Sequence, residues 1–220
     1  MARMTALKID FVSDVACPWC AVGLASLEQA LQRLDGDVQA ELHFQPFELN
    51  PQMGPEGQDI TEHLGQKYGS TAEQQAANWQ ALRARGEAVG FEFRKEGRGR
   101  VWNTFDAHRL LHWAGQQSPE AQRALKKALL RAYFTEARNV SDPQVLLDAV
   151  SAAGLDTERA QAILASDEFA ADVRGQQAFY AQHGISAVPS VIVNDRHLIQ
   201  GGQPPEVFEQ ALRQIAAQAA

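Results

Sequence analysis

Cys17 and Cys20 are the residues of this sequence whose type and spacing most directly suggest chemistry. They are the only two cysteines in 220 residues, and Pro18 and Trp19 separate them. Two thiols one helical turn apart can close a disulfide and open it again, so this C-x-x-C pair is typical of a redox-active dithiol. The alternatives are an inert pair of cysteines, or half of a zinc site. Because a zinc site usually takes four ligands and no second cysteine pair follows, we expect no metal here.

The position of Pro18 indicates which of the two thiols attacks. Proline is favoured at the first position of a helix, which would make Cys17 the N-cap. The free N–H groups and the dipole at that helix end should stabilise the Cys17 thiolate and lower the pKa of Cys17. Cys20 falls in line with Leu24 and Leu27 and should be the more buried sulfur. We therefore expect Cys17 to be the accessible, attacking thiol and Cys20 the resolving thiol.

The segments around the cysteines follow a β–α–β pattern. Residues 7–13 alternate as a strand does, residues 24–34 carry leucines at helical spacing, and residues 38–49 contain a second strand. A loop rich in proline and glycine follows, and from there to residue 183 the patterns are helical. Helix-start signatures such as the capping box of residues 70–73 support this assignment.

The strand pattern returns at Gly184. Residues 191–193 and 197–200 predict two strands joined by a turn, and a last helix follows two prolines. A C-x-x-C pair at a strand-to-helix junction in such an arrangement is typical of thioredoxin-like proteins. We therefore predict an α/β protein with a thioredoxin-like fold interrupted by an all-helical insertion domain. The expected boundaries are 1–57 for the N-terminal part of the thioredoxin-like domain, 58–183 for the insertion and 184–220 for the C-terminal part.

Val188 and Pro189 come directly before the strand at 191–193. In a thioredoxin-like sheet, a proline at this point faces the dithiol through a cis peptide bond, although an ordinary trans proline at a strand start is the alternative. We predict the cis form, with backbone groups of this loop binding an extended substrate. Trp19 should add an exposed apolar surface beside Cys17, and we expect both Pro18 and Trp19 to contact substrate.

Four segments resemble the FrnE-like branch of the DsbA thiol–disulfide oxidoreductase family, and the resemblance spans essentially the whole chain. They are residues 14–20 with Gly23 after them, 46–51, 103–110 and 184–190. The resemblance implies Cys17 as nucleophile, Cys20 as resolving thiol and Val188-Pro189 as a cis-proline loop. It also implies that Asn103 and His108 line the cleft opposite Cys17 and bind substrate.

The expected partners are protein or small-molecule thiols and disulfides. No cofactor is expected, although glutathione is a candidate redox partner. Two other functions stay open: a glutathione-dependent transferase or isomerase of the kappa or hydroxychromene carboxylate isomerase type, and a chaperone-like peptide binder. The relatives of the first kind typically carry a serine where this chain has Cys17. Only a dithiol cycle needs Cys20, whereas chaperone action would survive the loss of both cysteines.

Several other polar residues have a functional and a plainer interpretation. Asp10 and Asp14 belong to the strand before the motif and its end, and a carboxylate there could accept a proton from Cys20. The plainer interpretation, which we favour for Asp14, is a solvated or loop-capping residue, and for Asp10 it is a position facing solvent. The basic run at residues 94–100 is expected to be a solvated loop, with attraction of an anionic substrate as the alternative. His108 and His112 have metal-ligand spacing on a helix, but no third ligand is evident.

The overall charge excludes some functions. The net charge of −7 argues against a general binder of nucleic acid or of anionic membranes, since both require a basic surface. No run of 18 or more apolar residues occurs, and the first ten residues lack the apolar core of a signal peptide. We therefore expect a cytoplasmic protein without nucleic-acid or membrane partners.

Overall fold

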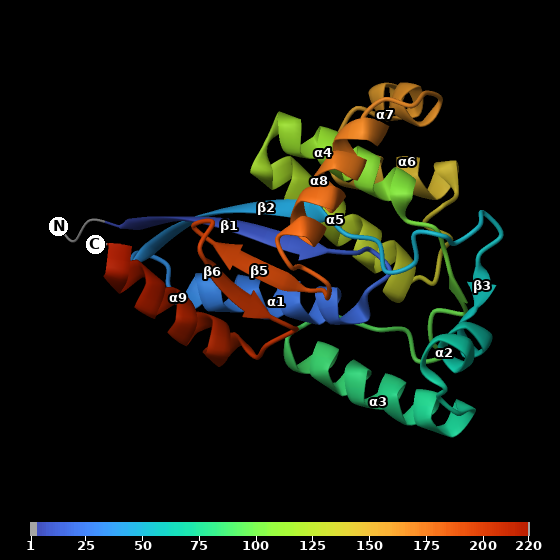
Figure 1. The fold of residues 1–220 in the computed structure, drawn as a ribbon, viewed down its shortest axis with the longest axis horizontal. Helices are drawn as coiled ribbons and strands as arrows, with labels where there is room; N and C mark the ends of the chain where they lie inside the picture. Colours follow the sequence, from blue (N-terminus) through green and yellow to red (C-terminus); the bar gives the residue numbers. More distant parts are fainter. Residues whose placement is uncertain (1–3, 220) are drawn as a thin grey trace.

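A four-stranded mixed sheet forms the centre of the computed structural model, which describes residues 4–219 (Figure 1). The strands lie in the order β2-β1-β5-β6. β1 (Thr5–Ser13) pairs in parallel with β2 (Val38–Pro46) and antiparallel with β5 (Ser190–Val193), and β6 (His197–Gln200) pairs antiparallel with β5. The two ends of the chain therefore build one sheet, as a thioredoxin-like fold requires.

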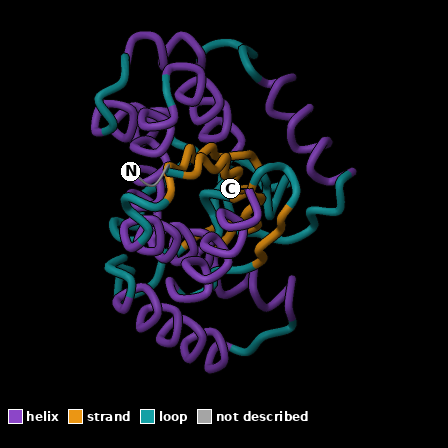
Figure 2. Tube along the Cα trace, turned by 90° about the vertical axis from the view of Figure 1, so that its left-hand side faces the viewer, coloured by secondary structure: helices purple, strands orange, loops and turns teal. Residues whose placement is uncertain are grey.

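Helix α1 (Pro18–Arg33) connects β1 to β2 and packs beside α9 (Pro205–Ala219). Leu24 and Leu27 lie on its buried face, so the leucine spacing that predicted the helix also seats it against the sheet. Viewed end-on, the strands occupy the middle of the molecule and helices surround them (Figure 2). Among residues 4–219, no helix is long and apolar enough to span a membrane.

The segment between β2 and β5 is the predicted helical insertion. Its helices are α2 (Ile60–Tyr68), α3 (Ala72–Ala88), α4 (Phe105–Gln117), α5 (Pro119–Phe134), α6 (Pro143–Ala152), α7 (Thr157–Leu164) and α8 (Ala170–Gln182). It also holds one short antiparallel strand pair, β3 (Gln58–Asp59) with β4 (Arg100–Val101), which is too short to show a sequence period. Buried side chains of the insertion and of the sheet form one continuous hydrophobic core.

The helix starts agree with the sequence signals, with one shift. Ser118 and Asp142 cap α5 and α6, each directly before a proline. The capping box of α3 lies one residue later than expected and uses Thr71 and Gln74. Ser70 instead donates its hydroxyl to the Leu64 carbonyl, which closes the preceding helix. A serine next to a threonine offers two candidate caps, and only the chain path decides between them.

A glutamine side chain forms hydrogen bonds with backbone groups at the outer edge of β2, where no neighbouring strand pairs with them. Gln122 on α5 accepts a hydrogen bond from Phe44 N at 2.8 Å, and its amide donates to Phe44 O at 3.1 Å and to Leu111 O at 3.0 Å. An edge strand leaves backbone groups unpaired, and buried unpaired groups are costly. Gln122 satisfies two of them and at the same time ties α4 and α5 to the sheet.

Replacing Gln122 with methionine should destabilise the protein by about 1–3 kcal/mol, because the Phe44 backbone groups would stay buried without partners. Urea unfolding of both proteins measures the difference. Glu120→Met, at an exposed position of the same helix, is the matched control and should have little effect. Equal stability of the two variants would show that the Gln122 hydrogen bonds do not hold the edge.

Candidate active site

The strand pairing brings the two predicted parts of the site together. β1 ends at Ser13 and β5 begins at Ser190, and the ladder pairs Val12 with Ser190. The segment before β5 therefore lies beside the segment that leads from β1 into α1. The Val188-Pro189 peptide bond in this segment is cis. The Cys17 Sγ lies 3.7 Å from the Val188 carbonyl oxygen, across 171 residues of sequence.

Two glycines allow the loops to approach α1 closely. A Cβ on Gly23 would lie 3.1 Å from Pro189 Cγ and 3.3 Å from the Cα of Gly202. A Cβ on Gly202 would lie 2.9 Å from the Trp19 carbonyl oxygen, which is shorter than side chains tolerate. The backbone of α1 from Trp19 to Gly23 is thus packed against the Pro189 ring and against the backbone of the loop after β6. This packing holds the Val188 carbonyl at the cysteine pair.

The first turn of α1 carries both cysteines, and both are free thiols. Cys17 is the N-cap and Pro18 the first helical residue, as the sequence predicted. Cys17 is only 3 % exposed and Cys20 fully buried, so the expectation of an accessible Cys17 is wrong for this conformation. The reason is tertiary, since the Val188 carbonyl lies against the sulfur. Trp19 is the exposed member of the motif, at 43 %.

The pKa values of the two thiols move in opposite directions. The pKa of Cys17 is lowered, first by a hydrogen bond from the Cys20 thiol, and this outweighs the effect of burial. The backbone N–H of Cys20 and the charge of Arg98 lower it further, while Asp14 opposes them. Burial, together with the hydrogen bond to Cys17, raises the pKa of Cys20 well above the usual value for cysteine. Cys17 is therefore the thiol that ionises first, and Cys20 is the thiol that keeps its proton longer.

The neighbouring thiol contributes more to this thiolate than the helix end does. The Cys17 side chain makes no capping hydrogen bond, and the Cys20 N–H, although near enough to lower the pKa of Cys17, donates to the Cys17 carbonyl at 3.1 Å. The sequence alone assigned most of the effect to the helix N-terminus. The structure corrects this assignment, because a hydrogen-bond donor in contact with the sulfur outweighs more distant dipoles.

The contribution of the Cys20 thiol predicts how the pKa of Cys17 changes when Cys20 is replaced. Cys17 should have a higher pKa in Cys20→Ala than in Cys20→Ser, because a serine hydroxyl can still donate to the Cys17 sulfur and a methyl group cannot. Ultraviolet absorbance of the thiolate during a pH titration measures both values. If the two variants titrate together, the helix end and not the Cys20 side chain stabilises the thiolate.

Asp14 is the buried centre of a polar network beside the dithiol. Its Oδ1 accepts hydrogen bonds from Thr104 Oγ1 at 2.7 Å, from His108 Nε2 at 3.2 Å and from Ala16 N at 3.3 Å, and its Oδ2 accepts from Leu49 N at 2.7 Å. Burial alone would raise the pKa of Asp14, but the His108 hydrogen bond and the other donors together lower it. Asp14 caps the loop as expected, yet it is buried rather than solvated.

The predicted cleft residues make hydrogen bonds within the protein. His108 is 2 % exposed and donates Nε2–H to the Asp14 carboxylate, so its ring faces the interior. The Asn103 amide donates to the Met53 carbonyl, and its carbonyl accepts from Phe105 N, which ties a loop to the start of α4. Both residues help to position α4, and substrate binding by them stays a prediction. The i, i+4 spacing of His108 and His112 gives no metal cluster among residues 4–219.

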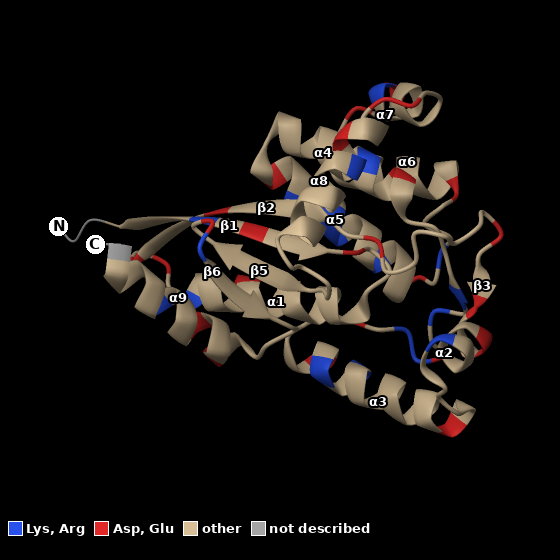
Figure 3. Ribbon diagram, in the orientation of Figure 1, with Lys and Arg blue, Asp and Glu red and all other residues tan. Residues whose placement is uncertain are grey.

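One residue of the basic run reaches the site. Arg98 donates from Nη1 to the Ala16 carbonyl at 2.6 Å, and its guanidinium lies 5.6 Å from the centre of the Tyr133 ring. In Figure 3, blue ribbon, which marks Lys and Arg, lies near β3 and α2. The neighbouring Arg94 and Lys95 are exposed, as expected of a solvated loop. The local sequence does not distinguish Arg98 from Arg94 and Lys95. Only the folded path of the chain places Arg98 beside the segment that leads into Cys17.

Asp10 also differs from its sequence interpretation. It lies in the middle of β1, where an outward position was expected, yet it is buried. Gln45 on the neighbouring strand donates to it at 2.6 Å, and Lys8 lies 3.1 Å away. These partners explain how a carboxylate is tolerated there. Both partners of Asp10 lie on strands of the sheet, and no hydrogen bond connects Asp10 with Cys17 or Cys20.

Comparison with known proteins agrees with this geometry. The sequence profile of the DSBA-like thioredoxin domain matches residues 8–213. The chain belongs to this family. The crystal structure of a probable DsbA oxidoreductase from Streptomyces coelicolor superposes with a TM-score of 0.87 at 36 % identity, over 94 % of this chain and 89 % of that one. The uncharacterized protein YwbO of Bacillus subtilis (strain 168) is 27 % identical over 208 residues, 94 % of this chain and 96 % of that protein.

Two more distant structures share the fold of the family. The cytosolic disulfide reductase DsbM from Pseudomonas aeruginosa, solved with GSH, superposes with a TM-score of 0.63 at 17 % identity, over 94 % of this chain and 98 % of that one. A 2-hydroxychromene-2-carboxylate isomerase superposes with a TM-score of 0.65 at 15 % identity, over 96 % and 97 %. At these identities the likeness concerns the fold alone.

Proposed function

We propose that this DSBA-like protein is a thiol–disulfide oxidoreductase that exchanges the Cys17–Cys20 dithiol with protein or small-molecule disulfides. The observation that carries the proposal is the pair of free thiols in the first turn of α1 with the cis Val188-Pro189 loop against Cys17 Sγ. The pKa values of the two thiols, lowered for Cys17 and raised for Cys20, support it. A stabilised thiolate beside a protonated thiol is the arrangement that a dithiol cycle uses. The oxidoreductase named among the structural relatives supports the same chemistry.

The cycle follows from the two roles. In the reducing direction, the Cys17 thiolate attacks one sulfur of a substrate disulfide, forms a mixed disulfide and expels the other substrate sulfur as a thiolate. Cys20 then attacks Cys17 Sγ, closes the Cys17–Cys20 disulfide and releases the second substrate sulfur. Two electrons pass from the protein dithiol to the substrate, and its two thiolates take up the two protons that the protein thiols give up.

The substrate contacts that we propose are Trp19 and the Val188-Pro189 loop. Trp19 offers an exposed aromatic face next to Cys17, and the Arg85 guanidinium lies 6.0 Å from the centre of its ring. The Val188 carbonyl lies against the Cys17 sulfur, where the backbone N–H of an extended substrate would meet it. Because Cys17 is nearly buried, access by a substrate sulfur requires a small displacement of this loop.

Cys20 distinguishes the proposed oxidoreductase from the alternative function, a glutathione-dependent transferase or isomerase. A transferase or isomerase needs one group to activate the glutathione thiol and has no use for a second, buried cysteine. Fold likeness to the isomerase and to the GSH-bound reductase is compatible with either chemistry. Glutathione as the molecule that recycles the dithiol stays part of this proposal.

The test is a count of released thiols. The reduced protein is mixed with an aromatic disulfide such as 5,5′-dithiobis(2-nitrobenzoate), whose thiol is coloured once it is released. A dithiol oxidoreductase should release two thiols per protein and end as an internal disulfide that is two hydrogens lighter by mass spectrometry. Release of one thiol with a stable adduct on Cys17 would favour the one-thiol alternative, and no release would overturn both.

The direction of the cycle is a separate measurement. Equilibration with glutathione redox buffers gives the reduction potential of the dithiol. A value well below the cytosolic glutathione poise of about −220 to −320 mV would make the protein a reductase, and a value well above it an oxidant or isomerase. A cytoplasmic location stays a prediction from the sequence.

A further inference from the structure

Lys126 is a buried lysine without a role in the sheet, in the Asp14 network or in the two thiol steps. It lies on α5, it is fully buried, and its Nζ has no hydrogen-bond partner within the described part of the chain. Burial of an unpaired ammonium is very unfavourable, so such a lysine tends to lose its proton. Burial indeed lowers the pKa of Lys126. A neutral amine in this position has a free lone pair and can accept a proton.

Helix α5 lies beside α1, since Arg123 and Lys127 of α5 pair with Glu28 of α1 at 2.6 and 3.0 Å. Negative charge on Cys20 of α1, on Asp14 before it and on Cys17 favours the ammonium form of Lys126 and opposes the effect of burial on its pKa, with Cys20 first. His108 on α4 lines the same small cavity as Lys126. β2 and α8 contribute uncharged residues to that cavity.

Neither Asp14 nor His108 is free to take the proton of Cys20. The Asp14 carboxylate already accepts four hydrogen bonds, and its pKa is lowered, which makes it a weak base. The Nε2 of His108 is occupied as the donor to that carboxylate. Lys126 is therefore the base near Cys20 whose acceptor site is unoccupied.

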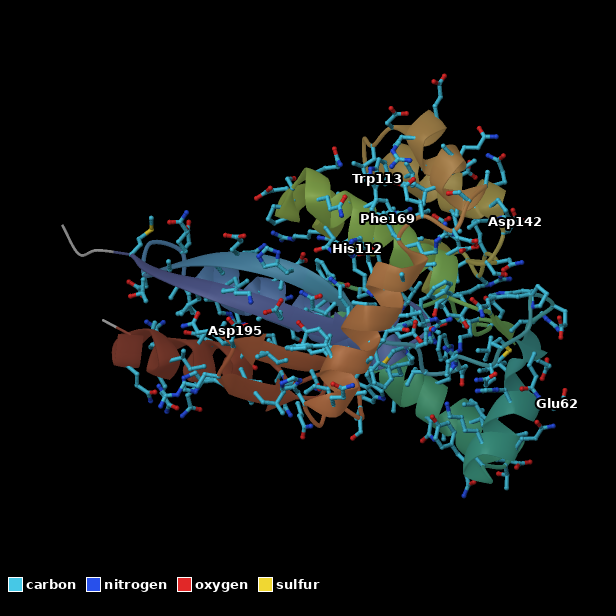
Figure 4. The ribbon with its side chains drawn as sticks, turned by 45° about the horizontal axis from the view of Figure 1, so that its top comes forward. Glu62, His112, Trp113, Asp142, Phe169 and Asp195 are labelled. Atoms are coloured by element: carbon cyan, nitrogen blue, oxygen red, sulfur yellow. The ribbon has the colours of Figure 1, made fainter. Side chains whose placement is uncertain are left out.

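A small cavity lies between Lys126 and two half-buried polar side chains, His112 and Gln176. It measures about 10 Å³, which is close to the smallest volume that holds one water molecule. His112 and Gln176 lie at its outer side, and the His112 Nδ1 is 3.3 Å from Gln176 Oε1. Figure 4 shows His112 next to Phe169, and their ring centres are 5.2 Å apart. A proton on Lys126 thus has a polar exit toward solvent between α4 and α8.

We propose that Lys126 accepts the proton of Cys20 when the mixed disulfide is resolved and exchanges it with solvent through this cavity. The proposal rests on the proposed dithiol cycle. In the mixed disulfide, the Cys20 proton moves to the Lys126 amine, the Cys20 thiolate attacks Cys17 Sγ, and the substrate sulfur leaves as a thiolate. In the reverse direction the Lys126 ammonium protonates Cys20 as it leaves Cys17. The substrate disulfide is the oxidant, so electrons and protons balance.

The test separates the two steps of one turnover. Stopped-flow mixing with 5,5′-dithiobis(2-nitrobenzoate) should give a first release for the Cys17 attack and a second for the resolution by Cys20. In Lys126→Met the first rate should stay unchanged, and the second should fall roughly 10²-fold at neutral pH, as expected for loss of a general base. The matched control is Lys127→Met on the same helix, whose amine is exposed and pairs with Glu28 at 3.0 Å. It should change neither step.

The pH profile distinguishes proton transfer from a structural role. In the wild type, the resolution rate should level off once the Lys126 amine is neutral, whereas in Lys126→Met it should keep rising about tenfold per pH unit into the alkaline range. Lys126→Met should melt at the wild-type temperature or higher, because an apolar side chain replaces a buried, unpaired amine.

The possible results point to different conclusions. Two releases in the wild type with the same pH profile in Lys126→Met would overturn the role of Lys126 and leave the dithiol cycle intact. A lower melting temperature with an unchanged profile would make Lys126 a packing residue. A wild type that never gives the second release would overturn the proposed function itself.

Discussion

Replacing Cys17 with serine is expected to reduce disulfide exchange to the uncatalysed background, a loss of roughly three orders of magnitude or more. A serine hydroxyl does not ionise near neutral pH, whereas the Cys17 thiolate is stabilised by the Cys20 thiol and by the helix end. Reduction of a peptide disulfide, followed by the appearance of free thiols, measures the loss.

Cys20→Ser is the matched variant for this prediction. It keeps the attacking thiolate and should form a mixed disulfide with the peptide that cannot be resolved. Mass spectrometry after proteolysis should place the adduct on Cys17. Exchange that persists in Cys17→Ser, or adducts found mainly on Cys20 in the wild type, would reverse the two assigned roles.

Replacing Asp14 with alanine should destabilise the protein by about 3–5 kcal/mol. The change removes the acceptor of four hydrogen bonds and leaves His108 and Thr104 buried without their partner. Chemical denaturation measures the free energy of unfolding. Asp148→Ala is the control, because Asp148 forms an exposed ion pair with Arg138 and should cost less than about 1 kcal/mol.

The same residue predicts a dependence of stability on pH. Burial would raise the pKa of Asp14, but its hydrogen bonds to His108, Leu49 N and Thr104 lower it below the usual value. A lowered pKa in the folded state gives stability that is present above the unfolded value of about 3.9 and is lost as the pH falls through the folded value. The difference in free energy of unfolding between the wild type and Asp14→Ala should therefore become smaller only below about pH 4.

Asp14→Ala has a second readout at the dithiol. The negative charge of Asp14 raises the pKa of Cys17, so this pKa should fall when the charge is removed. A variant that is destabilised as predicted but whose Cys17 titrates as in the wild type would show that the network supports the fold without influencing the thiolate. Equal stability of Asp14→Ala and Asp148→Ala at neutral pH would contradict the buried network altogether.

The sequence by itself determined the elements that carry the chemistry. Helix α1 begins at Pro18 with Cys17 as its N-cap, β1 precedes it, and Val188-Pro189 precedes β5. These features depend on neighbours within a few residues, namely a proline at a helix start, leucines at helical spacing and alternating strand residues. Local patterns of this kind are legible in a sequence because their physical causes are local.

Only the tertiary structure decided what surrounds the two sulfurs. Asp14, Arg98 and Lys126 come from the loop before α1, from the segment before β4 and from α5, and each looks like an ordinary surface residue in its local sequence. The low exposure of Cys17 and the inward position of His108 follow from packing between segments that lie 171 and 94 residues apart. Burial and long-range hydrogen bonds control pKa values, so the proton chemistry of the site emerged only when the chain was folded.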